Sequence, residues 1–247
     1  MKSVLIAGLC VLATGASAQE RVFSFDLGVG VQSKPGYFGA DEAVTGAGGS
    51  FEFERLLFGG LSLGGGDPNG FGFKGGVRFI GERKSDDFAD LAGLDDVDAA
   101  LEIGGGLTYT SEPDGQSQKW GNYAFTEVRY GAVGHESFVA QAGADLIYKP
   151  SEQVEFRAGP RLFAGDDDYA ATYFSDARVG FEAGGGVLSR GLEATASYDF
   201  DDTWGIVATA TYEQFLNDAA ASPIAQAGSA DQVSMSLIVT RAFSFSF

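Results

Sequence analysis

The chain has little cysteine, histidine or positive charge, and each shortage excludes a class of protein. It holds one cysteine and one histidine in 247 residues, and 34 acidic side chains against 16 basic ones give a formal net charge of −18. Sequence-independent binding of nucleic acid needs clustered lysine and arginine against the phosphates, so no nucleic-acid partner is expected. After residue 18, no apolar run reaches the 18 or more residues that a membrane-spanning helix needs.

Glycine and aromatic residues, in contrast, are abundant. The chain contains 37 glycines, and 13 % of its residues are aromatic. The glycines follow no Gly-X-Y period, which excludes collagen, and the aromatic content is too high for an acidic disordered chain. This composition is typical of a β-protein.

The first 18 residues have the features of a secretory signal peptide. Lys2 supplies the basic start, residues 4–13 form an apolar stretch, and Ala16-Ser17-Ala18 is a small-residue cleavage site. We expect export and cleavage after Ala18, leaving residues 19–247 as one domain. The cysteine, Cys10, lies in the removed segment, so the mature protein has no disulfide to stabilise it.

The rest of the chain alternates between apolar and polar residues with the period of two that marks β-strands. In one example, Phe71, Phe73, Val77 and Phe79 alternate with glycine, lysine and arginine. About twelve segments fit this pattern, and turn-like residues separate them. They are 23–31, 46–54, 56–65, 71–79, 99–109, 121–132, 138–148, 153–163, 178–188, 192–200, 203–214 and 233–247.

Three features favour a barrel in the membrane over a soluble sheet. The segments approach the ten residues of a tilted membrane crossing, whereas globular strands average five or six. Aromatic residues gather near the segment ends, as in interfacial girdles. Phe243, Phe245 and the terminal Phe247 resemble the signal read by the barrel-assembly machinery, although Arg241 interrupts their apolar stripe. We therefore predict an all-β, transmembrane, antiparallel up-and-down β-barrel of about 12 strands, surrounded by outer-membrane lipid.

An ordered set of short motifs runs along the mature chain. The motifs are 36–41 (GYFGAD), 76–78 (GVR), 91–96 (LAGLDD), 164–169 (AGDDDY), 173–174 (YF), Trp204, 212–220 (YEQFLNDAA) and 222–224 (SPI). Together they resemble the MltA-interacting protein MipA/OmpV outer-membrane family. The motif near the C-terminus carries most of the resemblance, and two departures from the family pattern are Ser175-Asp176 and Ala221.

The resemblance implies an outer-membrane barrel without enzymatic activity. Members of the family are described as scaffolds that join a peptidoglycan-cleaving enzyme to a peptidoglycan-synthesising one. Fold transfers between relatives more safely than function. A pore for small, mainly cationic solutes therefore stays open as an alternative, because the many acidic residues would favour cations in an open lumen.

The single histidine raises a third, more distant possibility. His135 and Ser137 share one face of a strand, and Glu127 or Glu152 could orient the imidazole. This arrangement resembles the His-x-Ser pair of outer-membrane lipid A deacylases, in which a base activates a serine. The neighbouring residues on the same face are polar, so it points to the lumen and away from lipid, and we expect no catalysis.

Acidic clusters provide the candidate contact residues. None has the ordered spacing of a calcium-binding loop, so no metal or other cofactor is assigned. Twelve strands with both termini in the periplasm would place 81–98 and 164–177 on the periplasmic side and 215–232 at the cell surface. Long periplasmic connections are unusual, so either the strand count differs from twelve or these segments dock periplasmic peptidoglycan enzymes. The candidate contacts are Asp86, Asp87, Asp95, Asp96, Asp166, Asp167, Asp168, Tyr169 and Tyr173.

Charged residues also fall on the polar face of the strands. In a barrel of about twelve strands they can pair and fill the lumen or line an open channel. The residues expected to face inward are Lys74, Arg78, Glu102, Arg129, Asp145, Glu182 and Glu193.

Overall fold

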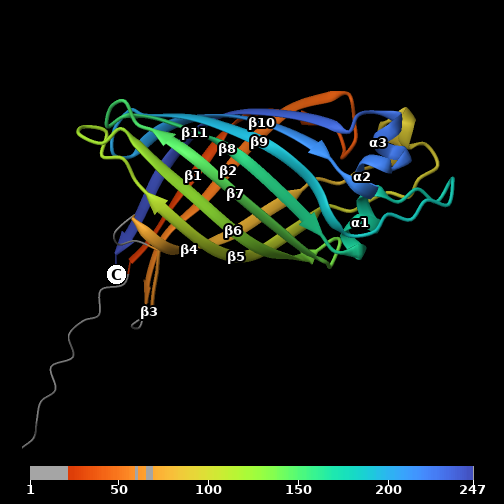
Figure 1. Cartoon of the computed structure of the whole chain (residues 1–247), viewed down its shortest axis with the longest axis horizontal. Coiled ribbons are helices and arrows are strands. Elements are labelled where there is room, and N and C mark those ends of the chain that lie inside the picture. Colours follow the sequence, from red (N-terminus) through yellow and green to blue (C-terminus); the bar gives the residue numbers. More distant parts are fainter. Residues whose placement is uncertain (1–21, 59–60, 65–68, 247) are drawn as a thin grey trace, which may run out of the picture.

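A computed structural model describes residues 22–58, 61–64 and 69–246 of the chain, and strands dominate it (Figure 1). The expected signal peptide lies outside these residues. The elements in chain order are β1 (Val22–Pro35), β2 (Ala43–Phe58), β3 (Leu61–Gly64), β4 (Gly70–Ile80), η1 (Ser85–Asp87), η2 (Ala89–Leu91), β5 (Ala100–Ser111), β6 (Trp120–Val133), β7 (Phe138–Tyr148), β8 (Val154–Gly165), α1 (Asp167–Phe174), β9 (Gly186–Asp199), β10 (Trp204–Phe215), α2 (Asn217–Ala221), α3 (Pro223–Ala227) and β11 (Asp231–Ser246).

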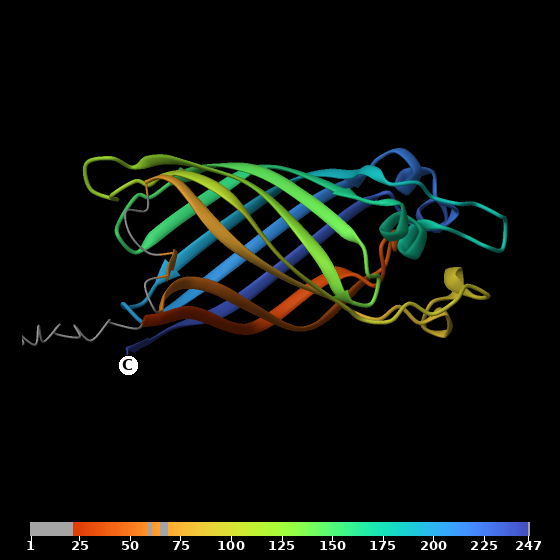
Figure 2. The ribbon, with the colours of Figure 1, turned by 90° about the horizontal axis from the view of Figure 1, so that it is seen from below.

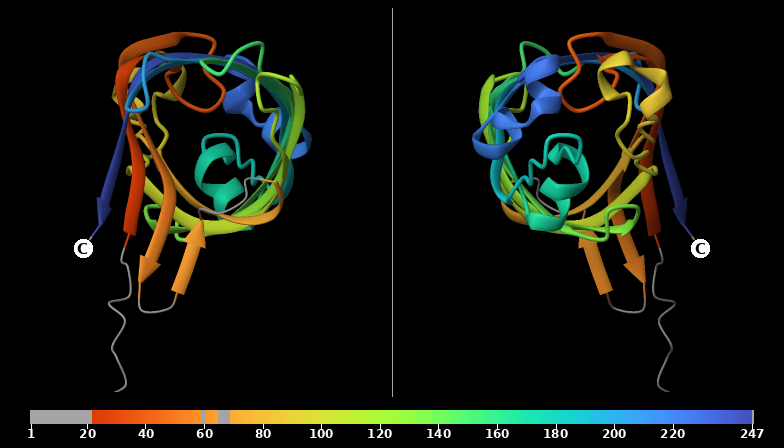
Figure 3. Two further views of the ribbon diagram at one scale, coloured as in Figure 1. Left: turned by 90° about the vertical axis from the view of Figure 1, so that its left-hand side faces the viewer. Right: turned by 90° about the vertical axis from the view of Figure 1, so that its right-hand side faces the viewer.

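The strands form one antiparallel sheet that curls into a barrel. Within the described residues it has eleven strands in the order β3-β2-β1-β11-β10-β9-β8-β7-β6-β5-β4. The first and last strands pair along most of their length, from Val22 with Ser246 to Ser33 with Met235. Figure 2 shows the tilt of the strands, and Figure 3 shows the ring that they make when viewed along the axis. The edges of the sheet are β3 and β4, and no ladder joins them in the described part of the chain.

The predicted fold class is confirmed, and the described ranges contain eleven strands where about twelve were expected. The segment 178–188 is not a strand of its own, because only its last three residues, 186–188, are extended and they begin β9. Its chain instead folds back in a short turn in which Gly180 has a φ of 68° and Arg178 binds Asp176. The two segments 46–54 and 56–65 become the long strand β2 and the four-residue strand β3.

The alternation in sequence becomes a difference between the two faces of the wall. Phe71, Phe73 and Val77 point outward and are 89 %, 77 % and 60 % exposed, as expected of side chains that meet lipid. Arg241, which interrupts the apolar stripe of β11, lies over the rings of Trp204 and Phe243 at 5.1 and 5.0 Å. This packing covers its apolar stem and explains how a charge is accommodated there.

The two ends of the barrel differ. The start of β1, the end of β11 and the short connections 112–119, 149–153 and 200–203 lie at one end, which we call the terminal end. The connections 36–42, 81–99, 134–137, 166–185 and 216–230 lie at the other end and form what we call the cap. The prediction that 81–98 and 164–177 share an end with the termini is therefore wrong. The prediction counted 46–54 and 56–65 as two full crossings of the barrel wall. Because β3 runs back for only four residues, this part of the chain makes one crossing. Each later connection, up to the predicted strand 178–188, therefore lies at the opposite end of the barrel from the one predicted.

The apolar core of the protein sits in the cap. Helix α1 lies inside the mouth of the barrel (Figure 3) and is buried along one side. None of the helices in the described ranges has the length and apolar character needed to cross a membrane. The core is built from α1 side chains and from residues of the surrounding strands, including Tyr169, Ala170, Tyr173, Phe174, Ile80, Val139, Leu188 and Phe215.

Candidate functional site

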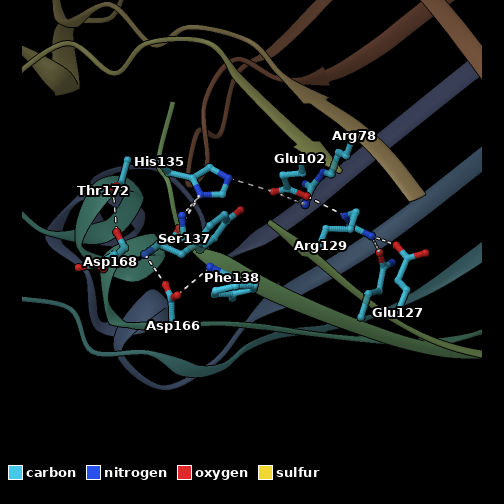
Figure 4. Close-up of polar contacts among 12 residues, drawn as sticks. Arg78, Glu102, Glu127, Arg129, His135, Ser137, Phe138, Asp166, Asp168 and Thr172 are labelled. Carbon is cyan, nitrogen blue, oxygen red and sulfur yellow. Dashed lines mark hydrogen bonds and ion pairs between the residues drawn. The ribbon is translucent and has the colours of Figure 1, made fainter. Parts of the chain in front are cut away.

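The inner face of strands β4 to β6 carries a network of ion pairs. Lys74 Nζ lies 2.7 Å from Glu127 Oε2, and Arg129 Nε lies 2.8 Å from Glu102 Oε2. Arg129 also pairs with Glu127, the carboxylate that Lys74 binds. Its other partner, Glu102, is shared with Arg78. Figure 4 shows Glu102 of β5 beside Arg129 and Glu127 of β6. Glu102 and Arg129 are almost fully buried, and a buried charge that lost its partner would cost several kcal/mol, roughly 3–5.

A second network continues on β7 to β9. Arg161 donates to both carboxylate oxygens of Asp145, at 2.6 and 3.0 Å, and to Glu193 at 2.8 Å. This forked geometry is the strongest form of a guanidinium–carboxylate pair. Both networks join neighbouring strands along the wall, and so they stiffen the lumen wall.

One side chain crosses the lumen. Arg78 of β4 places its guanidinium 5.4 Å from the ring of Phe163 on β8 and 5.9 Å from the ring of Phe38 in the cap. Of the residues expected to face inward, Glu182 does not do so, because it lies exposed in the connection between α1 and β9. Arg161 and Glu213 were not predicted from the sequence as lumen residues. Their alternation with apolar neighbours along the strand could have identified them.

His135 and Ser137 meet, but in a closed environment. His135 Nδ1 lies 2.5 Å from Ser137 Oγ, and Nε2 lies 3.4 Å from Glu102 Oε1. The acidic neighbour of the imidazole is therefore Glu102, which corrects the expected Glu127 or Glu152. Glu152 contacts Gln116 at the terminal end instead.

The burial of this group decides its role. Ser137 is 1 % exposed, and the imidazole packs edge-on against the rings of Tyr169 and Tyr173 of α1. Burial lowers the pKa of His135, and the nearby Glu102 partly opposes that shift. A serine nucleophile must reach its substrate, whereas here the hydroxyl is covered. The geometry pins the 134–137 turn to β5 and to α1.

The predicted contact aspartates have separate roles. Asp166 caps α1 by accepting from Tyr169 N, and Asp167 accepts from Gly185 N at 2.7 Å. Asp96 accepts from both the backbone and the hydroxyl of Ser85, and these hydrogen bonds lower its pKa. The side chains of Asp86, Asp87, Asp95 and Asp168 are exposed on the cap.

Two predicted contact residues are not at the surface. Tyr169 and Tyr173 are 1 % and 3 % exposed and belong to the core beneath the cap. Burial raises the pKa of Tyr173 to about 12. In the described part of the chain, no group of three or more histidine, cysteine, aspartate or glutamate residues is arranged to hold a metal ion.

The C-terminal aromatic residues lie in the strand that meets β1. Phe243 and Phe245 are opposite Phe25 and Phe23, and the rings of Phe25 and Phe243 stack at 5.4 Å. Phe247 lies outside the described residues. The role of Phe243, Phe245 and Phe247 as an assembly signal stays a prediction.

Two cavities adjoin inside the barrel. One of about 350 Å³ lies beneath the cap, between the end of β1, the end of β4 and α1. The other, of about 240 Å³, lies in the lumen beside Arg161 and Glu193. Arg78, Glu213 and Ser234 line both cavities and so form the boundary between them.

Comparison with known proteins gives one strong match. The model of the family described as MltA-interacting protein MipA matches residues 27–243. No curated protein sequence matches the chain significantly.

Similar solved structures are distant. An outer membrane channel from Pseudomonas putida F1 is 12 % identical, with a TM-score of 0.44, over 90 % of this chain and 95 % of that one. A Pseudomonas aeruginosa FadL homologue is 11 % identical, with a TM-score of 0.29, over 80 % of this chain and 61 % of that one. Similarities of this size say nothing about function.

Proposed function

The chain belongs to the MltA-interacting protein MipA family, and from that membership we propose that it is a non-enzymatic scaffold of the cell envelope. Its barrel sits in the outer membrane and binds a periplasmic peptidoglycan-cleaving enzyme of the MltA type, which it links to a peptidoglycan-synthesising enzyme. The observation that carries this proposal is the filled mouth of the barrel, where α1 packs into the apolar core. A barrel closed in this way suits a rigid platform better than a channel.

The proposal places the docking surface at the terminal end. With both termini in the periplasm, the cap faces the outside of the cell, so Asp86, Asp87 and Asp95 are out of reach of a periplasmic enzyme. The connections 112–119, 149–153 and 200–203 would meet the partner instead.

The test measures capture of a purified MltA-type enzyme by the barrel in lipid nanodiscs. Glu112→Gln, Glu152→Gln and Asp202→Asn together remove three charges at the terminal end. The matched control, Asp86→Asn with Asp87→Asn and Asp95→Asn, removes three from the cap. We expect the first variant to bind more weakly and the second to bind as the wild type does. The reverse pattern would return the docking surface to the cap, and no capture by the wild type would contradict the scaffold.

A pore remains the second candidate, and the two adjoining cavities favour it. Arg78, Glu213 and Ser234 form the boundary between these cavities. Recordings in planar bilayers separate the two functions. A silent wild type, with channels appearing once residues 167–174 are replaced by a glycine-serine linker, supports the closed scaffold. Steady, cation-favouring channels in the wild type support the pore.

A further inference from the structure

The cavity beneath the cap concentrates positive charge in a strongly acidic protein. Arg78 and Arg83 both line its wall, although the chain has 34 acidic and 16 basic side chains. Two carboxylates, Glu82 and Glu213, also line the cavity, but each has another partner. Glu82 pairs with Lys84 at 2.9 Å, and Glu213 accepts a hydrogen bond from Ser189.

The guanidinium of Arg78 is incompletely paired. Its nearest carboxylate oxygen, on Glu102, is 4.0 Å away, and the other oxygen of that carboxylate is bound by Arg129. The side chain is 36 % exposed, toward the interior spaces that it lines. Rings of Phe38 and Phe163 lie on it at 5.9 and 5.4 Å. Such rings hold a guanidinium in place and leave its N–H groups free to donate in its own plane.

Two further donors come from the cap. Arg83 is buried and donates one hydrogen bond, to the carbonyl of Tyr173 at 3.1 Å. Tyr173 is 3 % exposed, and its hydroxyl has no hydrogen-bond partner. A buried hydroxyl without a partner is destabilising, so its persistence in a wall of the cavity calls for an acceptor.

Apolar rings complete the lining. Tyr37 and Phe38 border the same space as the arginines, and Tyr37 packs edge-on against Phe88. Gln232 holds this wall by donating to the carbonyls of Ala40 and Ser229, at 3.1 and 2.7 Å. The wall is thus positioned by hydrogen bonds within the protein, as in sites that are formed before the ligand arrives.

We propose that this cavity binds a small aromatic carboxylate. Its carboxylate would accept hydrogen bonds from Arg78 and from the hydroxyl of Tyr173, with Arg83 adding positive charge, and its ring would lie against Phe38 and Tyr37. A guanidinium fork matches a carboxylate in geometry, and the volume of about 350 Å³ lies within the range of small-molecule sites. This binding activity is separate from the scaffold role and does not depend on it.

Calorimetric titration of the full-length barrel in nanodiscs tests the proposal. The probe is sodium benzoate, with benzamide as its uncharged counterpart and inorganic phosphate as an anion without a ring. We expect saturable binding of benzoate. Affinities for the other two should be at least about tenfold weaker, because benzamide lacks the negative charge and phosphate lacks the ring.

Three variants locate the site. Arg78→Met should weaken benzoate binding by about tenfold or more, and Tyr173→Phe by several-fold, since it removes only one hydroxyl. Lys119→Met is the matched control, because it removes one positive charge from an exposed connection at the terminal end, and it should bind benzoate normally. Thermal unfolding establishes that each variant is folded. If Arg78→Met does not fold, Tyr173→Phe and the benzamide comparison decide the matter.

The proposal is overturned by any of three results. The first is no saturable binding of benzoate by the wild type. The second is equal binding of benzoate and benzamide, which would show that the arginines take no part. The third is unchanged affinity in both cavity variants, which would place the site elsewhere.

Discussion

Asp166 joins the cap to the barrel wall: its Oδ2 accepts a hydrogen bond from Phe138 N at 2.7 Å, at the first residue of β7. The other oxygen of the same carboxylate accepts from Tyr169 N at 3.0 Å and so caps α1. One side chain therefore fixes both the start of the helix and its position in the mouth of the barrel.

Replacement of Asp166 should loosen α1. We expect Asp166→Ala to lower the stability of the closed cap by about 1 kcal/mol or slightly more, since it removes the helix cap and the bond to β7. Hydrogen exchange over residues 167–174 measures this. Asp168→Ala is the control, because Asp168 is exposed on the same helix, and it should leave the exchange nearly unchanged. Equal acceleration in both variants would show that Asp166 has no special role.

Removal of the Glu102 charge should destabilise the whole barrel. Glu102→Gln removes the 2.8 Å partner of the buried Arg129 and leaves it paired with Glu127 alone. We expect a loss of about 1–3 kcal/mol in the free energy of unfolding, less than for a buried charge with no partner left. Urea titration of the refolded protein in detergent measures the loss. Glu82→Gln, at an exposed pair with Lys84, should change the free energy little. A similar small effect at Glu102 would mean that water reaches the lumen network.

Two glycines one strand apart should respond differently to an added methyl group. A Cβ on Gly104 would lie 1.9 Å from the carbonyl oxygen of Val128, whereas a Cβ on Gly75 would meet nothing within 4 Å. We expect Gly104→Ala to cost about 1–3 kcal/mol or to impair folding, and Gly75→Ala to be tolerated. Yield of folded barrel and urea titration provide the comparison. Equal behaviour of the two variants would contradict the close approach of β5 to β6.

The cap should loosen in mild acid. Because burial lowers the pKa of His135, the opened turn binds a proton more readily than the closed one. The closed cap is therefore most stable above the ordinary histidine pKa of about 6.5, and it loses stability as the pH falls through the lowered pKa. Hydrogen exchange of residues 134–137 and 167–174 between pH 7.5 and 5 measures the effect, after correction for the intrinsic exchange rate. His135→Gln should remove this dependence. A dependence that persists in the variant would contradict the assignment to His135.

The alternation of residue types was enough to predict the barrel, because a strand places successive side chains on opposite faces. Phe71 and Phe73 had to face one way and Lys74 and Arg78 the other, whatever the surrounding strands. The same reasoning identified Glu102, Arg129 and Asp145 as inward residues, and all three are buried.

The strand count and the ends of the barrel depended on contacts that period-two patterns do not contain. The segment 178–188 alternates like a strand, yet Arg178 folds back onto Asp176 and the chain turns at Gly180. One crossing fewer between 46 and 65 then reversed the end at which 81–98 lies. Whether an alternating segment forms a strand depends on an adjacent strand that can hydrogen-bond to it.

The sequence by itself therefore determined the all-β fold, its apolar outer face and its charged inner face, because these follow from local alternation. Only the tertiary structure decided which charges meet. Glu102, His135 and Ser137 are brought together from β5 and the turn after β6, and Arg78 reaches Phe163 from four strands away around the sheet. The cap, the closed mouth and the arginine-lined cavity all depend on such long-range packing, which no local pattern encodes.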